Sequence, residues 1–139
     1  MDRLSIRYEH RCDADLTSAV ISRVVEAFYA KVRQDALLGP VFNEIVEEWD
    51  AHIEKVSAFW RYATRLDRTY NSRDFMPAHV GHAQIQASLL PQWLFLFRQT
   101  AMEICTDEVA KVLIDIAERM AESIEMSLAR RPPPSAAPC

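Results

Sequence analysis

The sequence predicts an all-α protein, because it is poor in glycine and its apolar residues follow a helical period. The chain contains two glycines, where an average composition of this length would give roughly ten. Few glycines disfavour the many tight turns of a β fold. Apolar residues recur every three or four positions in several long segments, as in amphipathic helices. We therefore expect a single domain over residues 1–131, with a loose lead-in over 1–13 and a disordered proline-rich tail over 132–139.

The first long helix is predicted over residues 16–34, where valine and phenylalanine recur every fourth position. Asp15 or Thr17 is a suitable N-cap. Gly39 and Pro40 follow, and the residue before a proline disfavours helical geometry. The stretch "LLGPVF" is therefore predicted to be a tight corner.

The second helix is predicted over residues 47–65. Its inward stripe alternates steps of three and four residues and consists of Trp49, His52, Val56, Phe59 and Ala63. A histidine in an otherwise apolar stripe needs a hydrogen-bond partner or a ligand. His52 is therefore a candidate functional residue.

An irregular segment over residues 67–87 carries His79 and His82 and precedes the third helix. That helix is predicted to begin near Ser88, with Pro91 in its first turn, where a missing N–H costs little. Its stripe is Leu90, Trp93, Phe97, Ala101 and Ile104.

The fourth helix is predicted to begin after Thr106, with acidic residues at the positive end of its dipole. The residues that it is expected to bury are Val109, Val112, Leu113, Ile116, Met120 and Ile124.

Composition excludes several classes of function. The net charge is −4, and no run of Lys and Arg is long enough to predict binding to nucleic acid or anionic lipid. No apolar stretch reaches the roughly 18 residues of a membrane span, and the N-terminus lacks the apolar region of a signal peptide. We therefore expect a cytoplasmic protein.

The cysteines Cys12, Cys105 and Cys139 are odd in number and far apart, which indicates free thiols. The sequence has no C-x-x-C, no C-x-x-C-H and no glycine-rich nucleotide motif.

The helical pattern turns four polar groups inward: Tyr29, His52, Trp93 and one of His79 or His82. Three interpretations remain open. The groups form a core hydrogen-bond network, or His79 and His82 begin a zinc site. The third interpretation is a haem pocket with an axial histidine.

Four stretches carry a resemblance to a known family: "AFYAKVRQDALLGPVF", "EEWDAHIEKVSAFW", a histidine fourteen residues before a tryptophan, and "WLFLF". In this order the chain resembles the group III truncated haemoglobins over roughly residues 20–105. These are short bacterial globins that enclose haem b in a two-over-two helical sandwich. The resemblance implies that fold, non-covalent haem b, and O₂, CO, NO or cyanide as ligands.

The resemblance also implies residue roles. His79 matches the proximal ligand of the haem iron, because its fourteen-residue spacing to Trp93 fits the family and that of His82 does not. On the distal side the matching residues are Tyr29, His52, Val56 and Trp93, with the aromatics Phe28, Phe42 and Trp60 around the pocket. Arg65, Arg68 and Arg73 are candidate partners of the haem propionates.

Three hypotheses of function follow from this set. A ligand held by three distal hydrogen-bond donors would dissociate slowly, which favours scavenging, sensing or redox chemistry over O₂ delivery. The second hypothesis is an enzyme with NO dioxygenase or peroxidase-like activity, which needs an external reductase because no flavin or NAD motif is present. The third is a non-haem helical interaction module. We expect a monomer or weak dimer.

Overall fold

The computed structural model describes residues 16–71, 73, 76, 79, 81, 82 and 84–130. Its regular elements are α2 (Ser18–Gln34), α3 (Leu38–Ile45), α4 (Trp49–Ala63), the 3₁₀ helix η2 (Ala87–Leu89), α6 (Leu90–Ile104) and α7 (Asp107–Ala129). This part of the chain contains no β-strand, so the all-α prediction is confirmed. The lead-in over 1–13 and the tail over 132–139, with Cys12 and Cys139, lie outside the described residues.

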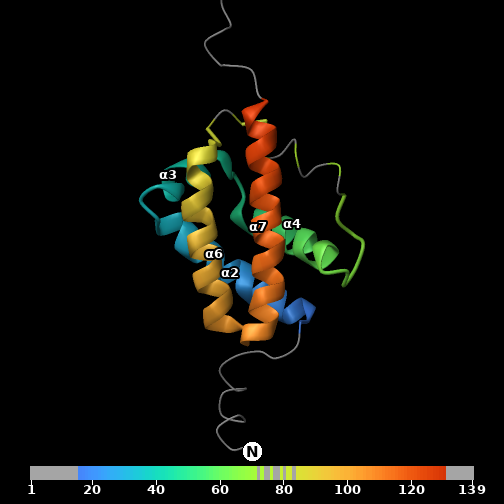
Figure 1. Ribbon diagram of the computed structural model, residues 1–139. Helices are drawn as coiled ribbons and strands as arrows, with labels where there is room; N and C mark the ends of the chain where they lie inside the picture. The colour runs from blue at the N-terminus through green and yellow to red at the C-terminus, as the bar shows by residue number, and fades with distance from the viewer. Residues whose placement is uncertain are drawn as a thin grey trace, which may run out of the picture.

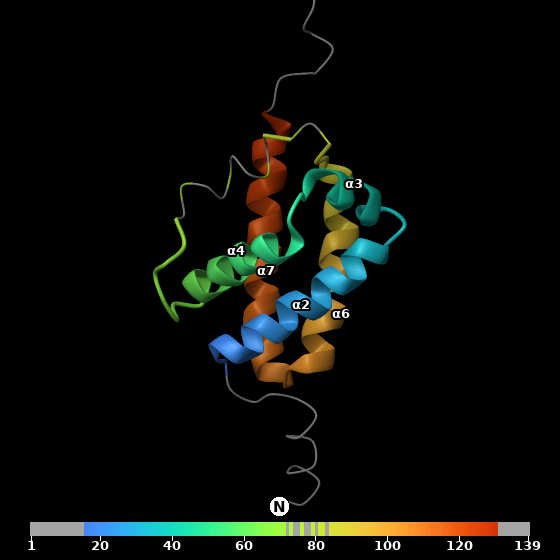
Figure 2. The same ribbon diagram turned by 180° about the vertical axis from the view of Figure 1, so that it is seen from behind.

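The helices form two layers. In Figure 1, α6 and α7 lie side by side in front, and α2 and α4 cross behind them. Figure 2 shows the same pairs from behind, with α2 and α4 now nearer the viewer. The backbone of α2 packs against α3, α4 and α6, and α6 packs against α7. This is the predicted two-over-two sandwich, and α2 contacts both its own layer and the other one.

Helix α2 begins as the sequence predicts. The Thr17 hydroxyl accepts a hydrogen bond from the Val20 N–H at 3.2 Å, which satisfies one of the free donors of the first turn. The predicted stripe Val20, Val24, Phe28 and Val32 is buried. Phe28 and Tyr29 thereby face the interior of the sandwich.

The stretch "LLGPVF" is helical, so the predicted tight corner is wrong. The Asp35 carboxylate accepts hydrogen bonds from the backbone N–H groups of Leu37 and Leu38 at 3.0 and 2.9 Å, and this caps the start of α3. Pro40 then lies in the first turn, where its missing N–H has no intrahelical partner to lose. Asp35 also accepts a hydrogen bond from the Gln92 side chain of α6 at 2.7 Å.

Gly39 sets the distance between α3 and the end of α2. A Cβ at this position would lie 2.9 Å from the carbonyl oxygen of Arg33, closer than real Cβ contacts. The same carbonyl accepts a hydrogen bond from the Asn43 side chain at 3.3 Å. The absence of a side chain at Gly39 therefore lets α3 lie directly against α2.

The third helical segment begins with η2, which contains Ser88, so the predicted N-cap role of Ser88 is wrong and Leu89 precedes α6. Pro91 lies in the first turn of α6, as predicted. Leu89 at the end of η2 and Leu90 at the start of α6 both reach the interior of the fold.

Helix α7 begins after Thr106, as predicted, and the Thr106 hydroxyl accepts a hydrogen bond from the Val109 N–H at 3.4 Å. Val112 was expected in the core but is 45% exposed. It lies about 100° or more around the helix from the buried face of Ala110, Leu113 and Ala117. The small alanines of that face let α6 and α7 pack closely.

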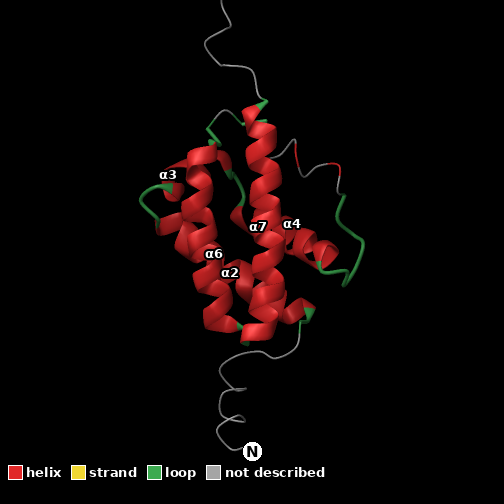
Figure 3. Cartoon of the chain, in the orientation of Figure 1, coloured by secondary structure: helices red, strands yellow, loops and turns green. Residues whose placement is uncertain are grey.

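An aromatic stack joins the two layers. The ring of Trp60 on α4 lies parallel to Phe97 on α6, with centroids 4.9 Å apart and planes 4° apart. Phe97 stacks on Trp93 at 6.0 Å, and Phe28 packs edge-on against both rings. The described part of the connection from α4 to η2, which includes His79, lies beside these layers (Figure 3).

We predict that Gly39→Ala lowers the free energy of unfolding by roughly 1–3 kcal/mol, because the added methyl group meets backbone that cannot rotate away. Urea unfolding followed by circular dichroism measures the change. Glu44→Ala on the exposed side of the same helix is the control and should change stability by less than about 0.5 kcal/mol. Equal stabilities of Gly39→Ala and the parent would show that α3 shifts without cost.

Candidate functional site

A cavity of about 510 Å³ lies between the two layers, inside the range of roughly 300–1,000 Å³ that is typical of cofactor pockets. Its walls come from α2, α3, α4, α6, α7 and the connection before η2. Eight residues singled out in the sequence line it: Phe28, Tyr29, Phe42, His52, Val56, Trp60, His79 and Trp93. The structure therefore brings together residues that lie far apart in the chain, from Phe28 on α2 to Trp93 on α6.

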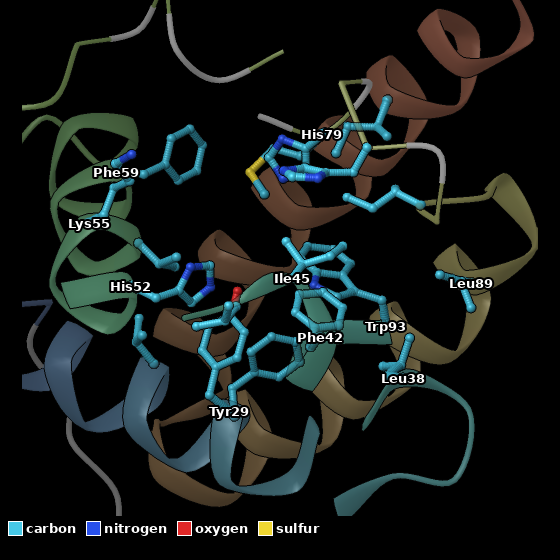
Figure 4. A pocket seen from close by; sticks show the side chains of 18 of the residues that line it. Tyr29, Leu38, Phe42, Ile45, His52, Lys55, Phe59, His79, Leu89 and Trp93 are labelled. Atoms are coloured by element: carbon cyan, nitrogen blue, oxygen red, sulfur yellow. The ribbon is translucent and has the colours of Figure 1, made fainter. Parts of the chain in front are cut away.

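His79 lies on one side of this cavity, and Tyr29 and His52 lie on the opposite side (Figure 4). His79 is half-buried, whereas His82, which also lines the cavity, is exposed. The loop before η2 supplies both histidines. The more enclosed position of His79 suits an imidazole that binds a group inside the cavity.

Tyr29 is buried in the wall formed by α2. Its ring packs edge-on against His52, with centroids 5.0 Å apart, and lies 6.0 Å from the ring of Phe42. Burial raises the pKa of the Tyr29 phenol above its ordinary value. The hydroxyl therefore stays protonated and remains a hydrogen-bond donor at physiological pH.

His52 lies in the first turn of α4, and its Nε2 atom is buried. Among the residues that the structure describes, this nitrogen has no hydrogen-bond partner. Leaving a buried polar atom unpaired costs about 1–3 kcal/mol, so such an atom indicates a site that a ligand or water completes. The orphaned nitrogen faces the same cavity as Tyr29.

The imidazole of His52 is neutral at physiological pH. Burial is the main cause that lowers its pKa to about 4, and electrostatic repulsion from Lys55 and His79 contributes to the same shift. A neutral imidazole has one N–H donor and one acceptor nitrogen. His52 can therefore donate one hydrogen bond into the cavity without carrying charge there.

Trp93 and Val56 complete the wall near these polar groups. Trp93 is half-buried on α6 and packs edge-on against Phe28 at 5.7 Å. Its indole N–H can only donate a hydrogen bond. Val56 lies one helical turn after His52 and is apolar, so the cavity combines a few donors with a mainly apolar lining.

The three candidate propionate partners, Arg65, Arg68 and Arg73, are exposed and do not line the cavity. Lys55, which was not among the residues predicted from the sequence, does line it. The spacing could have indicated Lys55, because a residue three positions after His52 lies on the same face of the helix. Lys55 is the cation on α4 that could bind an acidic group in the cavity.

The zinc interpretation lacks a set of ligands. Within the described part of the chain, no three His, Cys, Asp or Glu side chains are grouped so that they could hold a metal ion. His79 and His82 therefore have no third protein ligand there. In the same residues, no helix is both long and apolar enough to cross a membrane.

No protein-family model matches the chain. It is 29% identical over 112 residues to "Group 3 truncated hemoglobin ctb" of Campylobacter jejuni, and the match covers 78% of this chain and 87% of that protein. A crystal structure of a group III truncated haemoglobin from Campylobacter jejuni matches with a TM-score of 0.79 and 26% identity, over 86% of this chain and 96% of that one. The predicted truncated-globin fold is confirmed, as is the predicted resemblance to this group.

We predict that acid destabilises the protein through His52 when no ligand is added. The pKa of this imidazole falls from its ordinary 6.5 to about 4 on folding, so the unfolded chain binds more protons between these pH values. The free energy of unfolding should fall as the pH drops from 6.5 to about 4, with a slope below about 1.4 kcal/mol per pH unit. Urea unfolding over this range measures it.

His52→Leu is the control for this prediction, because it removes the titrating ring and keeps an apolar side chain of similar size. The variant should show a shallower dependence on pH between 6.5 and about 4. Parallel curves for the two proteins would mean that other groups cause the acid sensitivity.

Proposed function

We propose that this truncated-globin chain, which resembles group III truncated haemoglobins over most of its length, is a haem protein that binds small diatomic ligands. The observation that carries the proposal is the arrangement of the cavity. A half-buried histidine lies on one side, and a buried tyrosine and an unpaired histidine nitrogen lie on the other.

The residues present fit haem. The cavity has aromatic and aliphatic walls, which suit the flat apolar faces of a porphyrin, and one half-buried imidazole at the side. When bound, haem would supply an iron atom that can bind a histidine imidazole and a small ligand. In this proposal His79 would hold the iron, and Lys55, an exposed residue that lines the cavity, would pair with a propionate. The group is haem b, held without covalent attachment, because the sequence has no C-x-x-C-H.

The polar wall opposite His79 orients the ligand. The Tyr29 hydroxyl, the neutral His52 imidazole and the Trp93 indole each offer a donor. A hydrogen bond to a ligand that carries partial negative charge is worth about 1.5–3 kcal/mol, or roughly 10- to 100-fold in dissociation rate. Several such bonds make release slow. We therefore propose scavenging, sensing or redox chemistry of O₂, CO, NO or cyanide in place of O₂ delivery.

A second candidate function is enzymatic. Donors that retain O₂ also hold it for reaction with NO or for a peroxidase-like reaction, and electrons would then come from an external reductase. Stopped-flow mixing of the O₂-loaded protein with NO tests this candidate, followed by turnover with a reductase. Repeated turnover would support an enzyme, and a single slow exchange of ligands would support a binding protein.

The absorption spectrum of the purified protein tests the proposed function itself. A Soret band that shifts on reduction and on addition of CO supports haem binding. A colourless protein that takes up no added haem would favour the remaining alternative, a non-haem helical interaction module.

We predict that His79→Ala abolishes stable haem binding, because the cavity then lacks its enclosed axial ligand. Added imidazole should restore binding because it replaces the lost side chain. His82→Ala is the matched control, since His82 lines the same cavity but is exposed, and this variant should load haem as the parent does. Haem titration followed at the Soret band measures both. If His82→Ala fails to load and His79→Ala succeeds, the assignment of the proximal ligand is reversed.

We predict that Tyr29→Phe and Trp93→Phe each speed O₂ dissociation by about tenfold or more, since each removes a donor to a partly charged ligand. Stopped-flow ligand replacement gives these rates. CO, which carries less charge, serves as the internal control and should respond less. Equal acceleration of both gases in Tyr29→Phe would mean that the tyrosine acts by packing.

A further inference from the structure

Three rings lie together at the polar wall of the cavity. Trp49 packs against Tyr29 with ring centroids 5.7 Å apart and against His52 at 5.6 Å, and Tyr29 and His52 are 5.0 Å apart. Trp49 and His52 are three residues apart on α4 and share a face. Trp49 does not itself line the cavity, so it lies behind the two polar rings that do.

Arg33 fixes the outer side of Trp49. Its guanidinium carbon lies 4.5 Å from the centroid of the Trp49 ring, within the distance of a cation–π contact. Arg33 is one helical turn after Tyr29 on α2, so one helix contacts the tryptophan at two points. The backbone at Arg33 is in turn held by Asn43 and by the close approach of Gly39.

The position of Trp49 limits the motion of both polar rings. His52 is in the first turn of α4, and its imidazole faces the cavity while it contacts the rings of Trp49 and Tyr29. Trp49 and Tyr29 both pack against the imidazole by their edges, so an outward turn must displace a ring that Arg33 covers. A buried Nε2 atom without a partner would otherwise gain by turning to water.

We infer that Trp49, held by Arg33, is a positioning residue that keeps His52 and Tyr29 turned into the cavity. The inference rests on the proposed function for its meaning, because these two rings are the proposed ligand donors. The contacts of Trp49 involve protein side chains alone, so the inference can be tested with and without haem.

The first experiment uses the haem-free full chain and measures how fast diethyl pyrocarbonate modifies His52. Peptide mapping by mass spectrometry separates His52 from His79 and His82. Trp49→Ala should speed modification of His52 on the order of tenfold, and Trp49→Phe, which retains an aromatic ring, should stay near the parent. Arg33→Met should give a roughly two- to fivefold increase, as expected from a cation–π contact of about 0.5–1 kcal/mol, and Arg33→Lys should restore the parent rate.

A matched control separates positioning from general loosening of the helix. Ile53 is the next residue after His52 on α4, is partly buried against the core, and does not line the cavity. Ile53→Ala should therefore leave the modification rate of His52 near that of the parent. If Ile53→Ala accelerates it as much as Trp49→Ala does, or if Trp49→Ala leaves it unchanged, the inference is wrong.

The second experiment uses the haem-loaded protein and reads the infrared stretching band of CO, which reports hydrogen bonds to the ligand. Trp49→Ala should add a second band that coincides with the band of His52→Leu, and Trp49→Phe should keep the band of the parent. An unchanged single band in Trp49→Ala would contradict the inference. If the parent protein takes up no haem, the proposed function fails, and the modification rates still decide the role of Trp49.

Discussion

The stacking of Trp60 on Phe97 is the contact on which the cavity depends. Helices α2, α3, α4 and α6 meet mainly through α2, and the backbones of α4 and α6 do not pack closely along their length. The flat rings of Trp60, Phe97 and Trp93 bridge the space that remains. Protein interiors normally fill to the density of organic crystals. These large rings form part of the cavity wall, and their contacts join the two helix layers while a cavity of about 510 Å³ remains between them.

The same arrangement explains why the polar groups of the wall are neutral. Tyr29 and His52 are removed from water by the rings of Phe28, Phe42 and Trp49, and removal from water disfavours the charged form of each. The pKa of the phenol rises and that of the imidazole falls to about 4. The wall therefore offers hydrogen-bond donors without a fixed charge.

Much of the fold follows from periodicity in the sequence. Helices α2, α4 and α7 begin and end within a few residues of their predicted bounds, because each has a regular apolar face and α2 and α7 have a threonine cap. Helix α3 was missed because its start depends on a carboxylate outside the helix, at Asp35, which no pattern of proline and glycine reveals. Val112 was misplaced because a step of three residues from Val109 suggests a shared face, whereas alanines form the centre of the buried one.

The cavity residues were predictable to a similar degree. Tyr29, His52 and Trp93 lie on helix faces that the apolar period turns inward. Phe42, Trp60 and His79 were assigned by the family resemblance, because His79 lies in an irregular segment and Phe42 in a helix that was missed. All eight predicted residues line the cavity. The arginines after α4 were chosen for charge and nearness in sequence alone, and the chain leaves α4 through Arg65 in a left-handed conformation, with φ of 67°. Lys55 reaches the cavity because it shares a helix face with His52. Helical geometry, and not closeness in sequence to the loop, decides which cation is available.

The carboxylate of Asp35 has a mechanical consequence for the cavity. It is bound at once to the start of α3, through the Leu38 N–H, and to Gln92, the neighbour of Trp93 on α6. The hydrogen bond from Leu38 also holds the pKa of this carboxyl below its usual value, so the brace stays charged in all but acidic solution. The hydrogen bonds of Asp35 thereby link the parts of α3 and α6 that line the cavity. A wider cavity therefore disrupts less on the side of α4, whose described residues make no hydrogen bond to Asp35.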